Sequence, residues 1–227
     1  MKALVLFSGG IDSTTALGLA IKKYGKDQVI ALSVSYGQKH DKEIKAAIAV
    51  AQYYGVEHLF LDLSKIFQHS NCSLLQQSTE DIPEESYAEQ ISKTNGDNPV
   101  STYVPFRNGL FLSSSASIAL SKDCEVIYYG AHADDSAGFA YPDCSPVFNQ
   151  AMNEAIWEGS GHQLKIEAPF VNVSKAEVVR IGLELGVPYE LTWSCYEGGE
   201  KPCGKCGTCI DRAAAFQANQ MEDPALR

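Results

Sequence analysis

Long apolar runs and an excess of positive charge are both missing from this 227-residue chain. No apolar run approaches the roughly 20 residues that a bilayer-spanning helix needs. The first run, residues 3–7, ends at Ser-Gly-Gly instead of a signal-peptide cleavage site. We therefore expect a cytoplasmic protein with no membrane partner. The 28 acidic residues outnumber the 18 Lys and Arg, so the formal charge is -10, which disfavours direct nucleic-acid binding and favours a small substrate.

The order of apolar segments indicates an α/β fold. Strand-like runs occupy residues 3–7, 29–34, 58–63, 125–129 and 164–168, and helical periodicity occupies 12–24, 42–54, 108–121, 146–158 and 175–185. This alternation predicts a doubly wound, mostly parallel, Rossmann-like sheet. The stretch from Ser174 to Glu177 has the form of a capping box, which predicts that the last of these helices begins there.

Two segments interrupt the alternation. Residues 70–101 are polar and too long for a simple connection, so they read as a lid, a subunit contact or a mobile loop. Residues 194–211 are dense in Cys and Gly. We therefore divide the chain into residues 1–190, which form the α/β domain with its insertion, and residues 191–227, which form a small cysteine-rich segment followed by a C-terminal helix.

A polar knot, SGGIDSTT, lies between the first strand and the first helix. In a parallel sheet it falls at the carboxyl edge, where ligands bind. Its two glycines allow a tight turn, and the helix N-terminus that follows presents free amides to an anion. The carboxylate of Asp12 would repel phosphate unless it caps the helix or helps to hold a magnesium ion. The alternative is a glycine-rich helix start without a ligand.

Four cysteines near the carboxyl end form a Cys-x7-Cys-x2-Cys-x2-Cys array: Cys195, Cys203, Cys206 and Cys209. Four thiolates separated by glycines suit a closed tetrahedral zinc site. An iron-sulfur site is an alternative, although the Cys-Pro that would complete its common pattern is absent. Unligated thiols are the third reading.

Further polar residues gather where strands or loops meet helices. Arg107 and Asn108 precede a helix, and Arg107 could pair with a carboxylate or a phosphate or merely solvate the helix start. GAHADDSAGFAYPDC, residues 130–144, follows the fourth strand and brings His132 together with three aspartates, which favours acid and base chemistry; a solvated turn is the alternative. Lys175, in the first turn of a helix, could reach phosphate or remain a surface lysine.

The SGGIDS stretch resembles the loop of the PP-loop ATP pyrophosphatase superfamily, whose members transfer AMP to a substrate oxygen and release pyrophosphate. Together with SYGQKH, YVPFRN, GAHADD, YPDC, SKAEVV and the cysteine array, it makes the chain similar to the 7-cyano-7-deazaguanine synthase family over nearly its whole length. Two positions depart from the commonest pattern: Phe106 replaces a frequent Gly, and Lys39 a frequent Arg.

The resemblance implies a ligase that converts 7-carboxy-7-deazaguanine, ammonia and ATP into the nitrile that feeds queuosine in tRNA, through adenylated acid and amide intermediates. It implies ATP, Mg²⁺, one Zn²⁺ on the four cysteines and a homodimer. Free ammonia is expected because nothing in the chain reads as a glutaminase domain. The residues carried over for ATP are Phe7, Ser8, Gly9, Gly10, Ile11, Asp12, Ser13, Thr14, Thr15, Ala16 and Leu17. Those for the deazaguanine are Arg107, Asn108, Asp135, Tyr141 and Asp143, and the catalytic candidates are Lys175, Asp134 and His132.

Two competing functions remain open. Another PP-loop enzyme could adenylate a different oxygen, for tRNA thiolation or amide synthesis. A zinc-ribbon protein could instead bind nucleic acid or a partner and use ATP as a switch. The second needs a basic surface near the cysteines, where Lys201, Lys205 and Arg212 are balanced by Glu197, Glu200 and Asp211.

Overall fold

The computed structural model describes residues 1–94 and 98–226 and contains one parallel sheet in the order β3-β2-β1-β4-β5. Residues 95–97 of the polar insertion lie outside the described part. The strands are β1 (Ala3–Leu6), β2 (Val29–Ser35), β3 (Glu57–Asp62), β4 (Val126–Tyr128) and β5 (Lys165–Glu167). Each matches a predicted strand within about two residues, so the predicted doubly wound α/β fold is confirmed.

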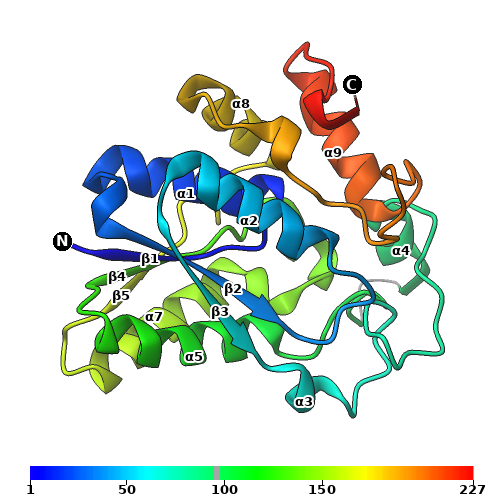
Figure 1. The fold of residues 1–227 in the computed structure, drawn as a ribbon. Coiled ribbons are helices and arrows are strands. Elements are labelled where there is room, and N and C mark those ends of the chain that lie inside the picture. The colour runs from blue at the N-terminus through cyan, green and yellow to red at the C-terminus, as the bar shows by residue number, and fades with distance from the viewer. Residues whose placement is uncertain (95–97, 227) are drawn as a thin grey trace.

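Helices cover both faces of the sheet (Figure 1). The longer ones are α1 (Ile11–Tyr24), α2 (Lys42–Tyr54), α5 (Arg107–Ser121), α7 (Pro146–Gly159), α8 (Lys175–Leu185) and α9 (Gly207–Ala218); the shorter ones are α3 (Ser64–Phe67), α4 (Tyr87–Thr94) and α6 (Ala133–Ser136). The Ser174 hydroxyl accepts a hydrogen bond from the Glu177 amide at 3.3 Å, so the predicted N-cap is confirmed. The Glu177 carboxylate instead pairs with Arg180, which leaves the capping box half formed.

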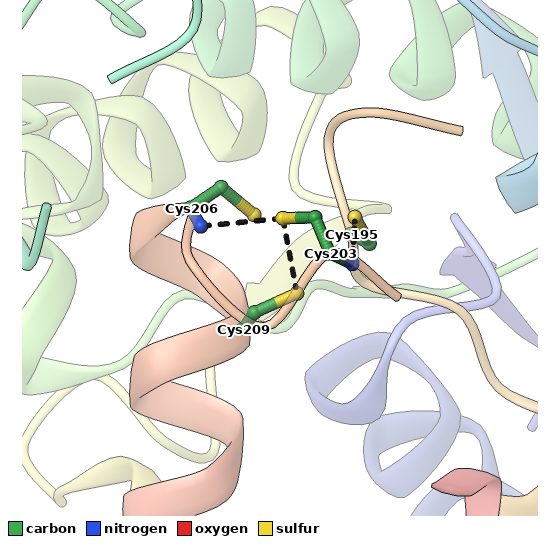
Figure 2. Close-up of side chains that lie close together, drawn as sticks. All are labelled: Cys195, Cys203, Cys206 and Cys209. Atoms are coloured by element: carbon green, nitrogen blue, oxygen red, sulfur yellow. Dashed lines mark hydrogen bonds between the residues drawn. The ribbon is translucent and has the colours of Figure 1, made fainter. Parts of the chain in front are cut away.

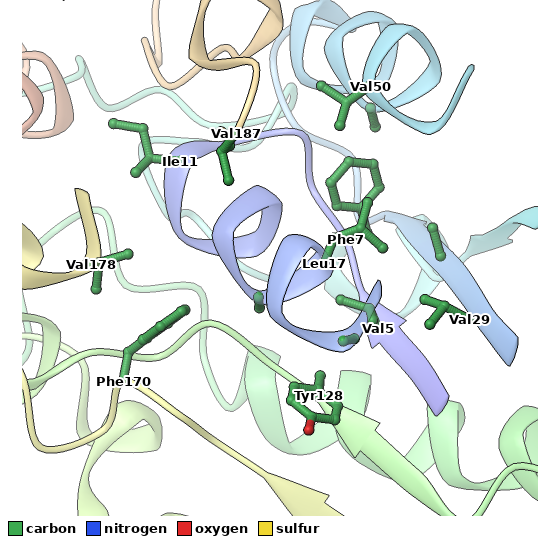
Figure 3. Packing of buried hydrophobic residues seen from close by; sticks show 14 of the residues in the cluster. Val5, Phe7, Ile11, Leu17, Val29, Val50, Tyr128, Phe170, Val178 and Val187 are labelled. Carbon is green, nitrogen blue, oxygen red and sulfur yellow. The ribbon is translucent and has the colours of Figure 1, made fainter. Parts of the chain in front are cut away.

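Alternate residues of β1 face opposite cores, as the pleat of a strand requires. Ala3 and Val5 join a cluster with α1, α2, α8 and α9, whereas Leu4 joins a cluster with α5 and α7. Figure 3 shows the first cluster, in which Phe7 lies between α1 and α2. With both faces covered by helices, the edge left for a ligand is the carboxyl end of the strands.

The polar insertion is not a plain surface loop. Cys72, Leu74, Leu75 and Ile82 are buried in a third cluster that also contains three of the four array cysteines. An antiparallel bridge between Gln38 and Leu75 ties the insertion to the loop after β2. The insertion and the cysteine segment, far apart in the sequence, therefore share one core.

A close contact between α1 and α8 makes Gly182 a sensitive position. A Cβ at Gly182 would lie 1.8 Å from the Tyr189 hydroxyl and 2.9 Å from Thr15 Oγ1, two groups that hydrogen-bond to each other at 2.7 Å. Because Tyr189 is 1% exposed, its ring cannot swing away. Gly182→Ala should therefore lower the free energy of unfolding by about 3 kcal/mol, measured by denaturant titration.

Gly159, in the last turn of α7, is the matched control. A Cβ there would meet nothing within 4 Å. Gly159→Ala should leave the stability unchanged or raise it by about 0.5 kcal/mol. Equal effects of the two substitutions would contradict the packing account.

Within the described residues, no helix combines the length and the apolar character that crossing a membrane demands.

Candidate functional site

The SGGIDS loop connects β1 to α1 and is braced by its own hydroxyls. The Gly10 amide donates to Ser8 Oγ at 3.3 Å, and the Ser8 amide donates to Ser13 Oγ at 3.2 Å. Thr14 Oγ1 donates to the Gly10 carbonyl at 2.7 Å. The N-cap residue Gly10 supplies no side-chain cap, so the first turn of α1 retains amides that can bind an anion.

Gly9 brings α2 against this loop. Its φ is +83°, and a Cβ would lie 2.5 Å from the Ala47 amide nitrogen and 2.7 Å from the Glu43 carbonyl oxygen. Only glycine tolerates both conditions. The first turns of α2 therefore border the loop, and the Trp193 amide closes its other side by donating to the Gly9 carbonyl at 3.0 Å.

Lys175 reaches the loop from α8. Its Nζ lies 3.2 Å from Asp12 Oδ2, and the residue is 9% exposed. Burial raises the pKa of Asp12, but the attraction of Lys175 and His132 outweighs burial and lowers the pKa below its ordinary value. Burial lowers the pKa of Lys175, but Asp12, Asp135 and Asp211 outweigh it and raise the pKa. Both groups are thus charged at neutral pH.

Two further predicted residues support this ion pair. Asp134 Oδ2 accepts a hydrogen bond from the backbone amide of Lys175 at 2.8 Å, which fixes the start of α8. The His132 side chain is buried, and its Nε2 lies 3.2 Å from Asp135 Oδ1 and 3.9 Å from Asp12 Oδ1. Across the part of the chain that is described, neither ring nitrogen of His132 nor Asp12 Oδ1 has a hydrogen-bond partner. Of these atoms, Asp12 Oδ1 belongs to a residue that lines the cavity described next and can meet a ligand, whereas the His132 ring, 1% exposed, faces Asp135 and Asp12.

A cavity of about 230 Å³ opens over the carboxyl edge of β1, β2 and β4. It is lined by the SGGIDS loop, by the starts of α2, α5 and α8, by the segment after β4, and by the cysteine segment. The predicted residues that line it are Phe7, Ser8, Gly10, Asp12, Ser13, Arg107, Asn108, Asp135, Tyr141 and Lys175. The cavity lies where parallel α/β sheets bind their ligands, outside the carboxyl ends of the strands.

The other predicted residues lie behind this surface. Ile11, Ala16 and Leu17 belong to the core beneath the loop, and Thr15 bonds to Tyr189. Asp143 is 4% exposed and accepts the Asn108 amide hydrogen bond at 2.8 Å, so it orients the start of α5. Burial raises the pKa of Asp143.

Aromatic side chains from distant segments form one wall of the cavity. Tyr141 follows β4, Tyr87 comes from α4 of the insertion, and Tyr196 comes from the cysteine segment. The Tyr87 and Tyr196 hydroxyls lie 2.6 Å apart, and the Tyr87 and Tyr141 rings meet edge to face at 5.5 Å. The insertion and the cysteine segment thus both complete the cavity.

Several lining residues were not expected from the sequence, among them Tyr36, Gln38, Glu43, Tyr87, Phe111 and Tyr196. The SYGQKH motif contributes to the family resemblance, but the sequence alone indicates no role for its side chains. Glu43 has the position of an ordinary acidic residue in a first helical turn, which complements the helix dipole. Tyr87 lies in a polar segment, and its contacts with Tyr141 and Tyr196 are long-range, so no local pattern could have found it.

The four array cysteines converge at the start of α9 (Figure 2). Their sulfur atoms all lie within 4.8 Å of one another. A tetrahedral Zn²⁺ with Zn–S bonds of about 2.3 Å separates its ligand sulfurs by about 3.8 Å, so small rotations would close the site on one ion. A four-iron cluster holds its cysteine sulfurs further apart, which fits this spacing less well.

Backbone amides surround these sulfurs. The Cys203 amide donates to Cys195 Sγ at 3.2 Å, and the Cys206 and Lys205 amides donate to Cys203 Sγ at 3.3 and 3.4 Å. Amide donors stabilise thiolates, the form that binds metal. The donor set therefore fits a structural metal ion closed to substrate.

Phe106, one of the two departures from the family pattern, has the left-handed φ of 54° and precedes α5 as its N-cap. Glycine, which the family resemblance predicts at this position, adopts that conformation without a Cβ penalty. The Phe106 ring lies against Gly109 and Phe148, and Phe106 is not among the residues that line the cavity.

A family model described as queuosine biosynthesis protein QueC matches residues 2–220. The chain is 43% identical to the 7-cyano-7-deazaguanine synthase of Archaeoglobus fulgidus, over 100% of this chain and 90% of the relative. It is 42% identical to the enzyme of the same name from Pseudoalteromonas atlantica, over 98% of this chain and 97% of that one. The Caldicellulosiruptor saccharolyticus enzyme is 41% identical, over 99% and 94%.

A solved structure shares the fold. It is the U34-tRNA thiolase NcsA from Methanococcus maripaludis with its [4Fe-4S] cluster, with a TM-score of 0.50 and 18% identity. The alignment covers 86% of this chain and 60% of the thiolase chain.

Proposed function

This chain belongs to the QueC family of queuosine biosynthesis proteins, and we propose on that premise that it synthesises 7-cyano-7-deazaguanine from 7-carboxy-7-deazaguanine, ammonia and ATP. It is an ATP-using, nitrile-forming enzyme, as its relatives are named. The observation that supports the assignment of the site is that one cavity, of about 230 Å³, is lined both by the SGGIDS loop and by the aromatic wall.

The chemistry requires the acid to be activated twice. A carboxylate resists ammonia until one of its oxygens becomes part of a good leaving group. Attack of that oxygen on the α-phosphorus of ATP releases pyrophosphate and forms an acyl adenylate. Ammonia then displaces AMP to give the amide. A second ATP activates the amide oxygen, and loss of AMP and a proton leaves the nitrile.

The loop and Lys175 are proposed to hold the departing pyrophosphate. The open amides of α1 and the hydroxyls of Ser8 and Ser13 would bind its oxygens. Lys175 Nζ, charged and 3.2 Å from Asp12 Oδ2, would transfer its interaction to the phosphates. Stabilisation of the charge that develops during transfer would then supply much of the rate.

The deazaguanine is proposed to lie against the aromatic wall. Tyr141 would border the ring, Arg107 would pair with an anionic oxygen, and Asn108 and Asp135 would bind polar edges. Asp143 would act indirectly by holding the amide of Asn108. His132 and Asp134 remain the proposed proton acceptors for nitrile formation, and Asp134→Asn with unchanged turnover would remove Asp134 from that role.

Metal ions are proposed at two places. Asp12 Oδ1 has no hydrogen-bond partner among the described residues, which fits the usual mode of Mg²⁺ in nucleotide enzymes, in which one or two carboxylates and the phosphates share the ion. Mg²⁺ would supply charge neutralisation of the triphosphate. The four cysteines would hold Zn²⁺ and thereby fix the position of Tyr196.

The main test is mass spectrometry of 7-carboxy-7-deazaguanine incubated with the protein, ATP, Mg²⁺ and ammonium. The expected result is the nitrile with two AMP released per product. Accumulation of the amide would locate the defect in the second activation. Unchanged acid, together with pyrophosphate release on another carboxylate, would support a different PP-loop adenylating enzyme and contradict the proposal.

A homodimer and a cytoplasmic location are also proposed, on the habit of the family and the biosynthetic role. Light scattering of the purified chain tests the first, and a monomeric mass with full activity would contradict it.

A further inference from the structure

A second, much smaller cavity adjoins the one just described. Its volume is about 10 Å³, and it is lined by Tyr36, Gln38, Lys39, His40, Glu43, Leu74 and Tyr196. Four of these residues also line the large cavity, namely Tyr36, Gln38, Glu43 and Tyr196. The two cavities therefore share a wall that includes Glu43, and the small one also borders exposed Lys39. Its volume is close to the minimum for one water molecule, and ammonia and ammonium have nearly the size of water.

Glu43 is the one carboxylate among the residues that line this small cavity. Its backbone is fixed by the contact of its carbonyl with Gly9. Within residues 1–94 and 98–226, its carboxylate has neither a hydrogen bond nor an ion pair, although α2 begins with Lys42 beside it. Lys42 instead places its Nζ over the Trp193 ring at 5.2 Å. Because Arg107 attracts the Glu43 carboxylate without forming an ion pair or a hydrogen bond with it, the carboxylate oxygens can still bind a cationic ligand.

The charged and titratable groups that face Glu43 are cationic or neutral, so none of them can bind a cation as a carboxylate does. Burial raises the pKa of Glu43 to about 7, and the attraction of Arg107 on α5 opposes this rise. The Arg107 guanidinium lies over the Tyr36 ring at 5.2 Å. Burial also raises the pKa of Tyr36 and of Tyr196, so both phenols stay neutral.

The two basic residues of the small cavity are turned to other partners. Lys39 Nζ donates to the Glu80 carbonyl at 3.1 Å. His40 Nδ1 accepts the Lys42 amide hydrogen bond at 3.2 Å, and burial lowers the pKa of His40. Glu43 is therefore the group in this small cavity that can attract a cation and accept a proton near neutral pH.

We propose that the small cavity receives the ammonium ion and that Glu43 is the catalytic residue that deprotonates it. This inference rests on the proposed function, which requires ammonia as the nucleophile. One proton of ammonium moves to the Glu43 carboxylate, and the lone pair so released attacks the carboxyl carbon of the acyl adenylate. A C–N bond forms, and the bond from that carbon to the AMP oxygen breaks with its electron pair leaving on AMP. The nitrogen loses its second proton to water, and Glu43 returns its proton to solvent past Lys39.

The test compares Glu43→Gln with the wild-type enzyme at two pH values. At neutral pH, kcat/KM for total ammonium should fall about 100-fold, the usual contribution of a general base. Pyrophosphate release from ATP and the acid, measured without ammonium, should keep its wild-type rate. In a buffer more alkaline than the pKa of ammonium, free ammonia is abundant, so the difference from wild type should shrink to a few-fold.

A further variant tests the small cavity independently of the Glu43 carboxylate, and a second one is its control. Leu74 lines only the small cavity, so Leu74→Phe should raise KM for ammonium severalfold and leave KM for the acid unchanged. Glu57→Gln, at an exposed ion pair with Lys122, is the control and should leave both KM values unchanged.

The outcomes distinguish this inference from the proposed function. A wild-type enzyme that makes no nitrile overturns the proposed function itself. A wild-type enzyme that makes nitrile while Glu43→Gln keeps its ammonium dependence at neutral pH overturns the role of Glu43 alone. Loss of pyrophosphate release in Glu43→Gln also overturns it, because Glu43 would then bind the acid or the nucleotide.

Discussion

Lys175→Met should lower the rate of pyrophosphate release about 1,000-fold, the effect expected when a donor to developing charge is lost from a water-poor site. Lys175 is 9% exposed, its Nζ lies 3.2 Å from Asp12 Oδ2, and it lines the same cavity as the SGGIDS loop. Methionine keeps the length and the packing of the side chain but removes the charge. The measurement is pyrophosphate release from ATP with 7-carboxy-7-deazaguanine under single-turnover conditions.

Loss of Lys175 also leaves Asp12 partly buried without its cation, which destabilises the folded state. The double variant Asp12→Asn with Lys175→Met separates the two effects. It should recover most of the thermal stability lost by Lys175→Met, because no lone charge remains, and it should recover none of the activity. Lys165→Met is the control, since Lys165 forms a half-exposed pair with Glu167 and does not line the cavity. Near-normal pyrophosphate release by Lys175→Met would exclude a role for this ammonium in the transfer.

Local sequence patterns predicted the sheet because each pattern reports a local constraint. Strands and helices alternate in the sequence because helices between the strands cover both faces of β1. Ser174 is recognisable because it caps the start of α8. The SGGIDS loop could be located for the same reason, since a strand, two glycines and the start of a helix are adjacent in the sequence.

The rest of the cavity depends on contacts that no local pattern encodes. Tyr87 meets Tyr196 across 109 residues of sequence, and Glu43 borders the loop only because Gly9 has no Cβ. The length of the polar insertion predicted that it is more than a connection, but its hydrophobic residues are too sparse to predict that it buries Leu75 against the cysteine segment. The individual roles of the candidate site residues remain predictions that the variants above test.

Removing one array cysteine should release the metal and disturb the cavity. Cys206 is 1% exposed, belongs to the third core cluster and is the N-cap of α9. Cys206→Ala should lower the free energy of unfolding by at least about 3 kcal/mol, because ligand binding to a structural zinc is coupled to folding. For a chain of this size, that corresponds to a fall in Tm of roughly 6–12 °C.

The structural change should remain local, because contacts that do not involve the metal also hold α9 in place. Arg212 pairs with Asp223, and its Nη1 donates to Thr192 Oγ1 at 2.9 Å. Segment 194–206 should therefore loosen while the sheet persists, and Tyr196 should leave the cavity wall. We expect Cys206→Ala to keep the circular dichroism of the wild type and to raise KM for the acid more than tenfold.

Elemental analysis and absorption spectra complete this test. The wild type should contain about one zinc per chain, as expected for four thiolates on one ion, and should show no visible absorption band. A brown protein containing iron would instead assign the array to an iron-sulfur cluster. Cys124→Ala is the matched control, since Cys124 is equally buried at 3% exposure but lies in the cluster beneath α5. It should keep its zinc and lose only about 1 kcal/mol of stability. Retention of a full zinc content and the wild-type Tm by Cys206→Ala would exclude Cys206 as a ligand, because a closed site cannot lose one of its four thiolates without weakening its hold on the ion.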